Sequence, residues 1–240
     1  MRHPGKKYYD TWAVKELQSE SRRFVLKWKA ANLANLALRS LKTGHIDSIC
    51  EIGGGEGIVL NTLGYILDVP YLVNYELSTV FCKYGQEHYP HINYINEEFS
   101  SKRSEKYQLI LLSDIIEHVE NDKHFLEEVS RSCQYCLIKI PIEENLTNHR
   151  LYYKLRGQIK PEALIYGPNH ENGHLRGYSL PKARNVVSNY FSILDESISD
   201  VNFFYGSERS KIIKHRFGTL ATIWLFGGAL FILAKSKNHP

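Results

Sequence analysis

The sequence predicts an α/β fold in which a mostly parallel sheet carries helices on both faces. Short apolar runs alternate with helical patterns between residues 46 and 141, which is typical of strand–helix–strand units. Runs such as LILL and CLIKI favour strands that are buried on both sides. A cluster of glycines at 53–57 follows the first strand, where an open sheet of this class binds ligands.

Individual elements follow from spacing and from turn signals. Apolar residues at three- and four-residue intervals predict helical structure from about 11 to 42, and Gly44 follows as a stop signal. Strands are expected at 46–52, 70–77, 92–99, 106–113, 135–141, 191–198 and 229–236. Helices are expected from the glycine turn to about 67, at 79–88, after an Asn121 cap, and from Ser179 to about 190. We therefore divide a single domain into 1–45, 46–141, 142–179 and 180–240.

Composition excludes several classes of protein. The formal net charge of +4 is too small to indicate nucleic acid, and 43% hydrophobic residues are ordinary for a globular chain. Cys133 and Cys136 form a C-x-x-C without a second ligand pair, so we expect neither a disulfide framework nor a metal site. The N-terminus has no signal-peptide core, which predicts a cytoplasmic location.

Residues 217–234 run without a charge and just reach the length of a membrane span. The Gly227–Gly228 pair interrupts this run, and ALFILAKS after it is typical of a buried strand. We favour an element of the globular fold. A membrane tether for an enzyme acting on a lipid-linked substrate is the alternative.

The glycine turn differs from the common phosphate-binding loops. Ile58 stands where G-x-G-x-x-G needs its third glycine, and no Gly-Lys-Ser/Thr follows. Glu56 would lie where a pyrophosphate normally sits, and the two negative groups would repel. The turn therefore predicts a ligand without phosphates and with positive charge.

The stretch from Glu51 to Gly57 resembles E/D-x-G-x-G-x-G, the first motif of class I S-adenosylmethionine-dependent methyltransferases. That donor carries a sulfonium and an amino group, which carboxylates attract. The resemblance covers about residues 46–200. It implies a Rossmann-like, seven-stranded, mostly parallel sheet with an antiparallel last strand. It also implies an N-terminal helical lid (1–45) and a substrate cap (142–179) inserted after the fifth strand.

The resemblance also implies the residues that bind the cofactor. Glu76, 25 positions after Glu51, would accept hydrogen bonds from the ribose hydroxyls. Glu98 would bind the adenine amino group, with Glu97 as the alternative. Further contacts are expected from the motif residues, from neighbours of these acids and from the lid: Glu51, Gly53, Gly55, Gly57, Leu77, Phe99, Ser113 and Tyr9.

Candidate catalytic residues follow the fourth strand, where LILLSDIIEHVEN resembles the family's fourth motif. A hydroxyl acceptor benefits from a general base, and His118 and His174 are the candidates. Asp114 would orient the acceptor or the sulfonium. A structural role for His118 is the alternative.

For the acceptor itself we expect contacts from Arg176, Tyr178 and Tyr166 in the 142–179 insertion, because aromatic and guanidinium groups suit a ring with an anionic substituent. An ordinary surface excursion is the alternative.

The predicted function is methyl transfer from S-adenosylmethionine to an oxygen or nitrogen of a small molecule, such as a sugar or an isoprenoid ring. The absence of D/N-P-P-Y and of a Pro-Cys pair argues against nucleic acid as the acceptor. A nucleotide-cofactor oxidoreductase and a donor-binding module without catalysis are the alternatives. The oligomeric state stays open.

Overall fold

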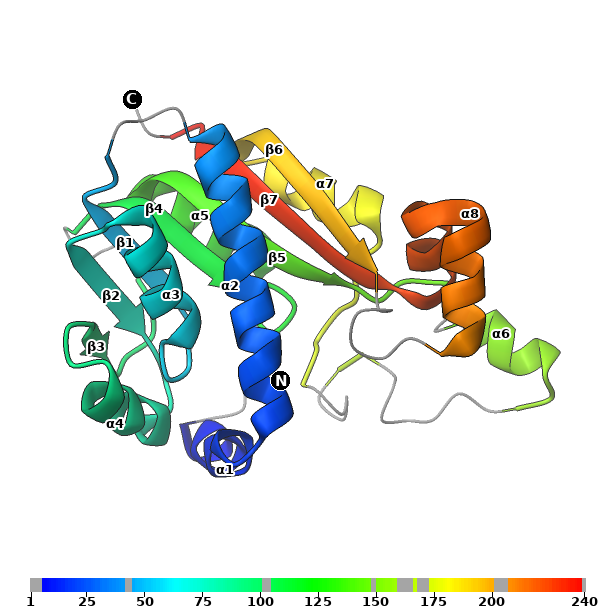
Figure 1. Ribbon diagram of the computed structural model, residues 1–240, viewed down its shortest axis with the longest axis horizontal. Coiled ribbons are helices and arrows are strands. Elements are labelled where there is room, and N and C mark those ends of the chain that lie inside the picture. The colour runs from blue at the N-terminus through cyan, green and yellow to red at the C-terminus, as the bar shows by residue number, and fades with distance from the viewer. Residues whose placement is uncertain are drawn as a thin grey trace.

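The computed structural model describes residues 6–41, 45–100, 105–147, 150–158, 166–167, 173–200 and 207–238. Its centre is one seven-stranded sheet with the order β3-β2-β1-β4-β5-β7-β6 (Figure 1). The strands are β1 (Ser48–Ile52), β2 (Tyr71–Tyr75), β3 (Asn93–Ile95), β4 (Tyr107–Ser113), β5 (Cys133–Ile142), β6 (Phe191–Asp200) and β7 (Gly228–Ser236). Strand β7 runs antiparallel to both of its neighbours, and the other pairings are parallel. The predicted fold class is confirmed.

Alternate residues of the central strands pack into two separate hydrophobic cores, one on each face of the sheet. On one face, Leu109 and Leu111 pack with α2 (Glu20–Ser40) and α3 (Ile58–Leu67). On the other face, Ile110 and Leu112 pack with α5 (Asp122–Ser132) and α7 (Leu180–Ser188). Because side chains in a strand alternate between faces, a strand that is apolar at successive positions supplies both cores. The loops that follow β1, β2 and β4 lie at the carboxyl ends of these parallel strands.

The helical pattern predicted from about 11 to 42 is present, but it begins earlier than expected and divides into two helices. Helix α1 spans Lys6–Leu17, and Ser19 starts α2 by accepting a hydrogen bond from the Arg22 N–H (3.3 Å). A side-chain oxygen at this position satisfies an otherwise unpaired N–H of the first helical turn. The chain therefore turns between the two helices. Helix α1 lies beside α4 (Thr79–His88) near the carboxyl ends of β1 and β2 (Figure 1).

The apolar run 217–234 divides at the predicted glycine pair. Its first part ends α8 (Glu208–Phe226), a helix that the sequence did not predict, and its second part is most of β7. Gly227, at φ 89°, ends the helix, and β7 is almost wholly buried between β5 and β6. None of the helices in the described ranges has the length and apolarity to cross a membrane.

The remaining predictions hold with altered bounds. The Asn121 side chain accepts a hydrogen bond from the His124 N–H (3.1 Å) and caps α5, as expected. Helix α6 (Arg150–Leu155) lies in the insertion after β5. Strand β3 ends at Ile95, so the acids expected at the end of a longer strand lie in the following loop.

Gly85 in α4 tests how closely this helix approaches β3. A Cβ at Gly85 would lie 2.4 Å from the ring of Tyr94, whose hydroxyl donates to the Glu56 carbonyl in the glycine loop (2.8 Å). Gly85→Ala should lower the free energy of unfolding by about 1–3 kcal/mol despite alanine's better helix propensity. The exposed neighbour Gln86→Ala is the control. Equal melting temperatures for the two variants would contradict this packing.

Candidate functional site

The loop from Gly53 to Gly57 joins β1 to α3 in a conformation that requires glycine. Gly53, Gly55 and Gly57 have φ values of 70°, 57° and 86°. A Cβ would lie 2.7 Å from Ile115 Cδ1 at Gly53 and 2.5 Å from the Tyr94 hydroxyl at Gly57. Side chains disfavour this left-handed region, and neighbouring atoms fill the space that a side chain would need. The loop therefore leaves main chain accessible at Gly53 and partly at Gly54, where the first strand meets its helix, while Gly55 to Gly57 are buried.

The carboxylate of Glu76 holds this loop at the end of β2. It accepts hydrogen bonds from the Gly55 N–H (2.8 Å) and the Ser78 N–H (2.7 Å). Asn74 braces the same turn, because its amide accepts from the Gly54 N–H (3.2 Å) and donates to the Gly55 carbonyl (3.0 Å). The structure thus brings the predicted ribose-binding acid directly against the predicted glycine motif.

Glu51 is fully enclosed beneath the loop. Its carboxylate accepts a hydrogen bond from the Leu60 N–H in the first turn of α3 (3.1 Å). Burial raises the pKa of Glu51 to about 8, although that hydrogen bond and Lys29 favour the ionised form. A cationic ligand above the loop would favour ionisation.

Glu56 is paired within the protein, which changes our interpretation of this residue. Its buried carboxylate receives both terminal nitrogens of Arg22, one of them at 2.7 Å. Arg22 also lies over the Phe81 ring, 4.9 Å from its centroid. Because the guanidinium offsets the charge of Glu56, repulsion of a pyrophosphate by this acid is weaker than the sequence suggested.

Helix α1 covers the Glu76 end of the site. Asp10 accepts hydrogen bonds from the Ser78 hydroxyl (2.8 Å) and the Val80 N–H (3.2 Å), which anchors α1 to the start of α4. Tyr9 is half-buried close to Glu76, and burial together with the charge of Glu76 raises its pKa. The predicted lid residue therefore lies beside the predicted ribose acid.

The residues expected around adenine divide into two groups. Phe99 is buried and packs edge-on against Tyr75, with ring centroids 5.2 Å apart. Glu97 and Glu98 are both exposed. Instead, Asn96 donates to the carbonyls of Glu76 (2.8 Å) and Leu77 (3.0 Å). An adenine contact from Glu98 stays a prediction, and Asn96 is a neighbour that the sequence did not single out.

At the end of β4, Asp114 is held by two cations. Its carboxylate pairs with Lys139 of β5 and with Lys29 of α2 (2.5 Å). Burial opposes ionisation, but the two lysines hold the pKa of Asp114 below its usual range. Asp114 therefore connects α2 to the carboxyl end of β4 and to β5. Its low pKa also makes it a weak proton acceptor. The adjacent Ser113 hydroxyl is buried and has no hydrogen-bond partner within the described ranges.

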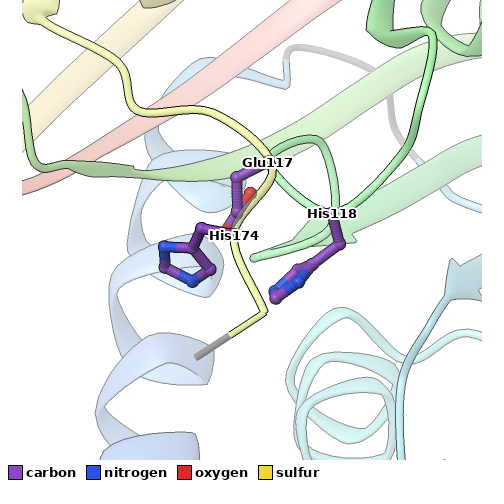
Figure 2. A group of neighbouring side chains, drawn as sticks. All are labelled: Glu117, His118 and His174. Atoms are coloured by element: carbon purple, nitrogen blue, oxygen red, sulfur yellow. The ribbon is translucent and has the colours of Figure 1, made fainter. Parts of the chain in front are cut away.

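Glu117, His118 and His174 converge beyond β4 (Figure 2). The imidazole rings of His118 and His174 are 4.8 Å apart and edge-on. Burial lowers the pKa of His118 to about 4, and the charge of the neighbouring His174 contributes to the same shift. Burial also disfavours the cation at His174, but the hydrogen bond to Glu143 and its charge raise the pKa of this histidine. The two predicted bases thus lie in one cluster. The Tyr8 hydroxyl of α1 lies near Gly173, next to this cluster: a Cβ placed on Gly173 would be 3.4 Å from that hydroxyl.

The three residues expected to bind the acceptor lie together, in a hollow separate from the histidine cluster. Arg176, Tyr178 and Tyr166 line an open hollow of about 470 Å³ between α5 and α7. Among the described residues that line it, none belongs to the glycine loop or the histidine cluster.

Moreover, Arg176 donates to the carbonyls of Ile116 (3.2 Å), Val119 (2.6 Å) and Glu120 (2.6 Å). Tyr178 is buried and donates to Asp122 (2.6 Å). These bonds fix the loop that carries Glu117 and His118, while substrate binding by Arg176 and Tyr178 stays a prediction.

Comparison with known proteins identifies the fold. No protein-family model and no curated protein sequence matches this chain. Among solved structures, it is similar to that of the complex between the Haloferax volcanii Trm112 methyltransferase activator and its methyltransferase partner, with 11% identity and a TM-score of 0.63. That match covers 98% of this chain and 99% of the other. The chain has the class I methyltransferase fold.

Two further structures show what this fold accommodates. The plantazolicin methyltransferase BpumL, solved with S-adenosylhomocysteine, is 15% identical with a TM-score of 0.58, over 94% of each chain. The [4+2]-cyclase SpnF is 10% identical with a TM-score of 0.57, over 86% of this chain and 80% of that one. Because a cyclase shares the fold, the reaction has to be argued from the residues of the site.

The buried Glu51 predicts a specific dependence of stability on pH. Its folded-state pKa of about 8 exceeds the unfolded value, so the folded state binds an extra proton between about pH 4.5 and 8. Wild-type stability from this group is therefore lost as pH rises through that window, by about 1.4 kcal/mol per unit. Glu51→Gln should match the wild type near pH 4.5 and exceed it by a few kcal/mol near pH 8. Parallel pH profiles in chemical denaturation of the ligand-free protein would contradict this.

Proposed function

We propose that this protein transfers a methyl group from S-adenosylmethionine to an oxygen or nitrogen of a small-molecule acceptor. The observation that supports this most is the contact between the Glu76 carboxylate and the Gly55 N–H. It joins an acid at the end of β2 to the bare main chain after β1, which is where the fold binds nucleosides. Each carboxylate oxygen can accept a second hydrogen bond, so Glu76 has capacity for the two ribose hydroxyls.

The rest of the donor would extend from Glu76 in two directions. Adenine would lie near Asn96, which binds the carbonyls of Glu76 and Leu77, and against the buried Phe99 ring, with half-buried Leu77 as an apolar neighbour. The methionyl part would cross the glycine loop above Glu51, and a carboxylate favours the amino group and the sulfonium. Ser113, with its unpartnered buried hydroxyl, would face the sulfonium from the end of β4.

Methyl transfer is an in-line displacement, so alignment and exclusion of water supply much of the catalysis. Helix α1 approaches both ends of this path, through Tyr9 beside Glu76 and through Tyr8 beside Gly173 and His118. We propose that α1 closes over the bound donor and that the histidine cluster activates the acceptor. Asp114, already paired with two lysines, would act by positioning this end of the site.

The acceptor we favour is a small metabolite such as a sugar or an isoprenoid ring, methylated in the cytoplasm. The hollow near Tyr166 would then bind a distal part of such a molecule. A screen of candidate metabolites with an isotopically labelled methyl donor, read by mass spectrometry, would identify it.

Binding of the donor separates this proposal from an oxidoreductase. Calorimetry should detect S-adenosylmethionine and give no heat with NAD. Glu76→Ala should weaken donor binding by about 10- to 100-fold, because a hydrogen bond to a charged group contributes about 1.5–3 kcal/mol. Glu87→Ala, which removes an exposed acid from α4, is the matched control. NAD binding without donor binding would instead support a nucleotide-cofactor oxidoreductase.

Turnover separates an enzyme from a donor-binding module. Replacing His118 or His174 with alanine should reduce methyl transfer by about 10²–10⁴-fold, the usual contribution of a group that assists proton removal. Donor affinity should stay unchanged, because neither imidazole contacts the glycine loop in the described structure. Full activity in both variants would rule out this role.

A further inference from the structure

Glu117 presents a buried carboxylate that has no hydrogen-bond partner among the described residues. The side chain is 0% exposed, and neither of its oxygens has a hydrogen-bond partner. Leaving an acid in this state costs several kcal/mol, so buried carboxylates normally meet a donor, a proton or a cation. The positive charges that favour its ionised form are those of His174 and, more weakly, Lys139, which is already paired with Asp114. The carboxylate therefore lacks a hydrogen-bond partner of its own within the described structure.

The two neighbouring imidazoles are oriented as metal-binding histidines usually are. His118 Nδ1 lies 3.2 Å from the Gly173 carbonyl, which can only accept, so this nitrogen carries the proton. His174 Nδ1 lies 2.7 Å from a carboxylate oxygen of Glu143. A histidine that binds a metal through one nitrogen commonly donates the other N–H to a carbonyl or carboxylate. Nε2 is then the nitrogen of each ring that would meet a cation.

We propose that Glu117, His118 and His174 form a binding site for one divalent transition-metal ion. Each residue offers a ligand atom, and these atoms lie within 4.8 Å of one another. Donors bound at about 2.1 Å lie at most about 4.2 Å apart, so small side-chain rotations close the site. Two imidazoles and one carboxylate suit zinc, iron or manganese better than magnesium or calcium, which prefer oxygen ligands. The sequence analysis predicted no metal site. His118 and His174 are 56 positions apart, so their spacing gives no local motif.

The surrounding residues hold this geometry in place. Arg176 binds three carbonyls of the loop on which Glu117 and His118 stand, and the Glu117 carbonyl itself accepts from the Leu175 N–H (2.9 Å). The segment carrying His174 is thus tied to the loop carrying the other two ligands. Three protein ligands leave coordination positions open, as in metal sites that bind substrate.

An open position gives the metal a role in the reaction, a step that rests on the proposed function. An acceptor hydroxyl bound to the metal would release its proton to solvent water more readily. Its oxygen would then form the new bond to the methyl carbon while the bond from that carbon to the sulfonium sulfur breaks, and S-adenosylhomocysteine would leave. The two imidazoles would act by holding the metal and not as proton acceptors.

Metal binding can be measured on the full-length protein without any methyl donor. After treatment with a chelator and dialysis, calorimetry with Zn²⁺ should give one site per chain, and Co²⁺ should give the absorption bands of a protein-bound ion. Glu117→Gln, His118→Ala and His174→Ala should each weaken Zn²⁺ binding by more than tenfold. Glu143→Gln, which alters only the orienting carboxylate, should weaken it by about 10- to 100-fold. His124→Ala, at a surface histidine paired with Glu128, is the matched control and should bind as the wild type does.

Donor binding and melting temperature serve as checks that each variant folds. The proposal is overturned if the wild type binds neither ion, or if folded Glu117→Gln binds as tightly as wild type, in which case a proton satisfies Glu117. Metal binding without donor binding would overturn the proposed function but support the metal site. Donor binding without metal binding would overturn the metal site but leave the proposed function supported.

Discussion

The hydrogen bond from the Gly55 N–H to the Glu76 carboxylate joins two adjacent strands at their carboxyl ends. Gly55 has a left-handed conformation there, and Cβ atoms on Gly53 and Gly57 would lie too close to Ile115 and Tyr94, so this form of the loop favours glycine. The Asn74 amide makes a similar bond with the preceding Gly54 N–H. The Glu76 carboxylate also accepts from the Ser78 N–H at the start of α4, and the Ser78 hydroxyl donates to Asp10 of the N-terminal helix. A chain of polar contacts thus runs from the first strand to helix α1. Loosening the loop would disturb each later contact.

A second set of contacts links this region to the histidine cluster. Lys29 of α2 and Lys139 of β5 meet at Asp114, three residues before Glu117. Arg176 then clamps the loop that follows. The other charges described in this part of the structure are largely balanced in pairs, whereas neither oxygen of Glu117 has a hydrogen-bond partner among the described residues. A buried carboxyl group without such a partner, next to two oriented imidazoles, distinguishes this site from simple structural packing.

Much of the fold could be predicted because it depends on local patterns. The alternation of apolar strands with helices fixed the class, and Gly227–Gly228 marked the boundary between α8 and β7. The break between α1 and α2 was missed, because a single capping serine within a continuous helical pattern gives a weak signal. The helical character of 208–226 was missed because its apolar residues do not form one face, and several of them are exposed.

The site was predicted less completely, because pairing partners are distant in sequence. Glu51, Glu76 and the glycines carry a motif, whereas the partnership of Glu56 with Arg22 spans 34 residues and has none. Asn74 and Lys139 did leave a signal, since each is a polar residue inside an apolar strand. Arg176 was assigned to the acceptor on its chemistry alone, and only the folded geometry shows its guanidinium bound to three carbonyls. Charge predicts that a residue needs a partner but not which one.

The central claim is that the glycine loop and Glu76 together hold the adenosine of a methyl donor. A crystal structure of the protein with S-adenosylhomocysteine tests it most directly. The account predicts both ribose hydroxyls within hydrogen-bonding distance of the Glu76 carboxylate and the amino acid portion lying over Gly53 to Gly55. A ligand bound elsewhere, or a ribose turned away from Glu76, would contradict it.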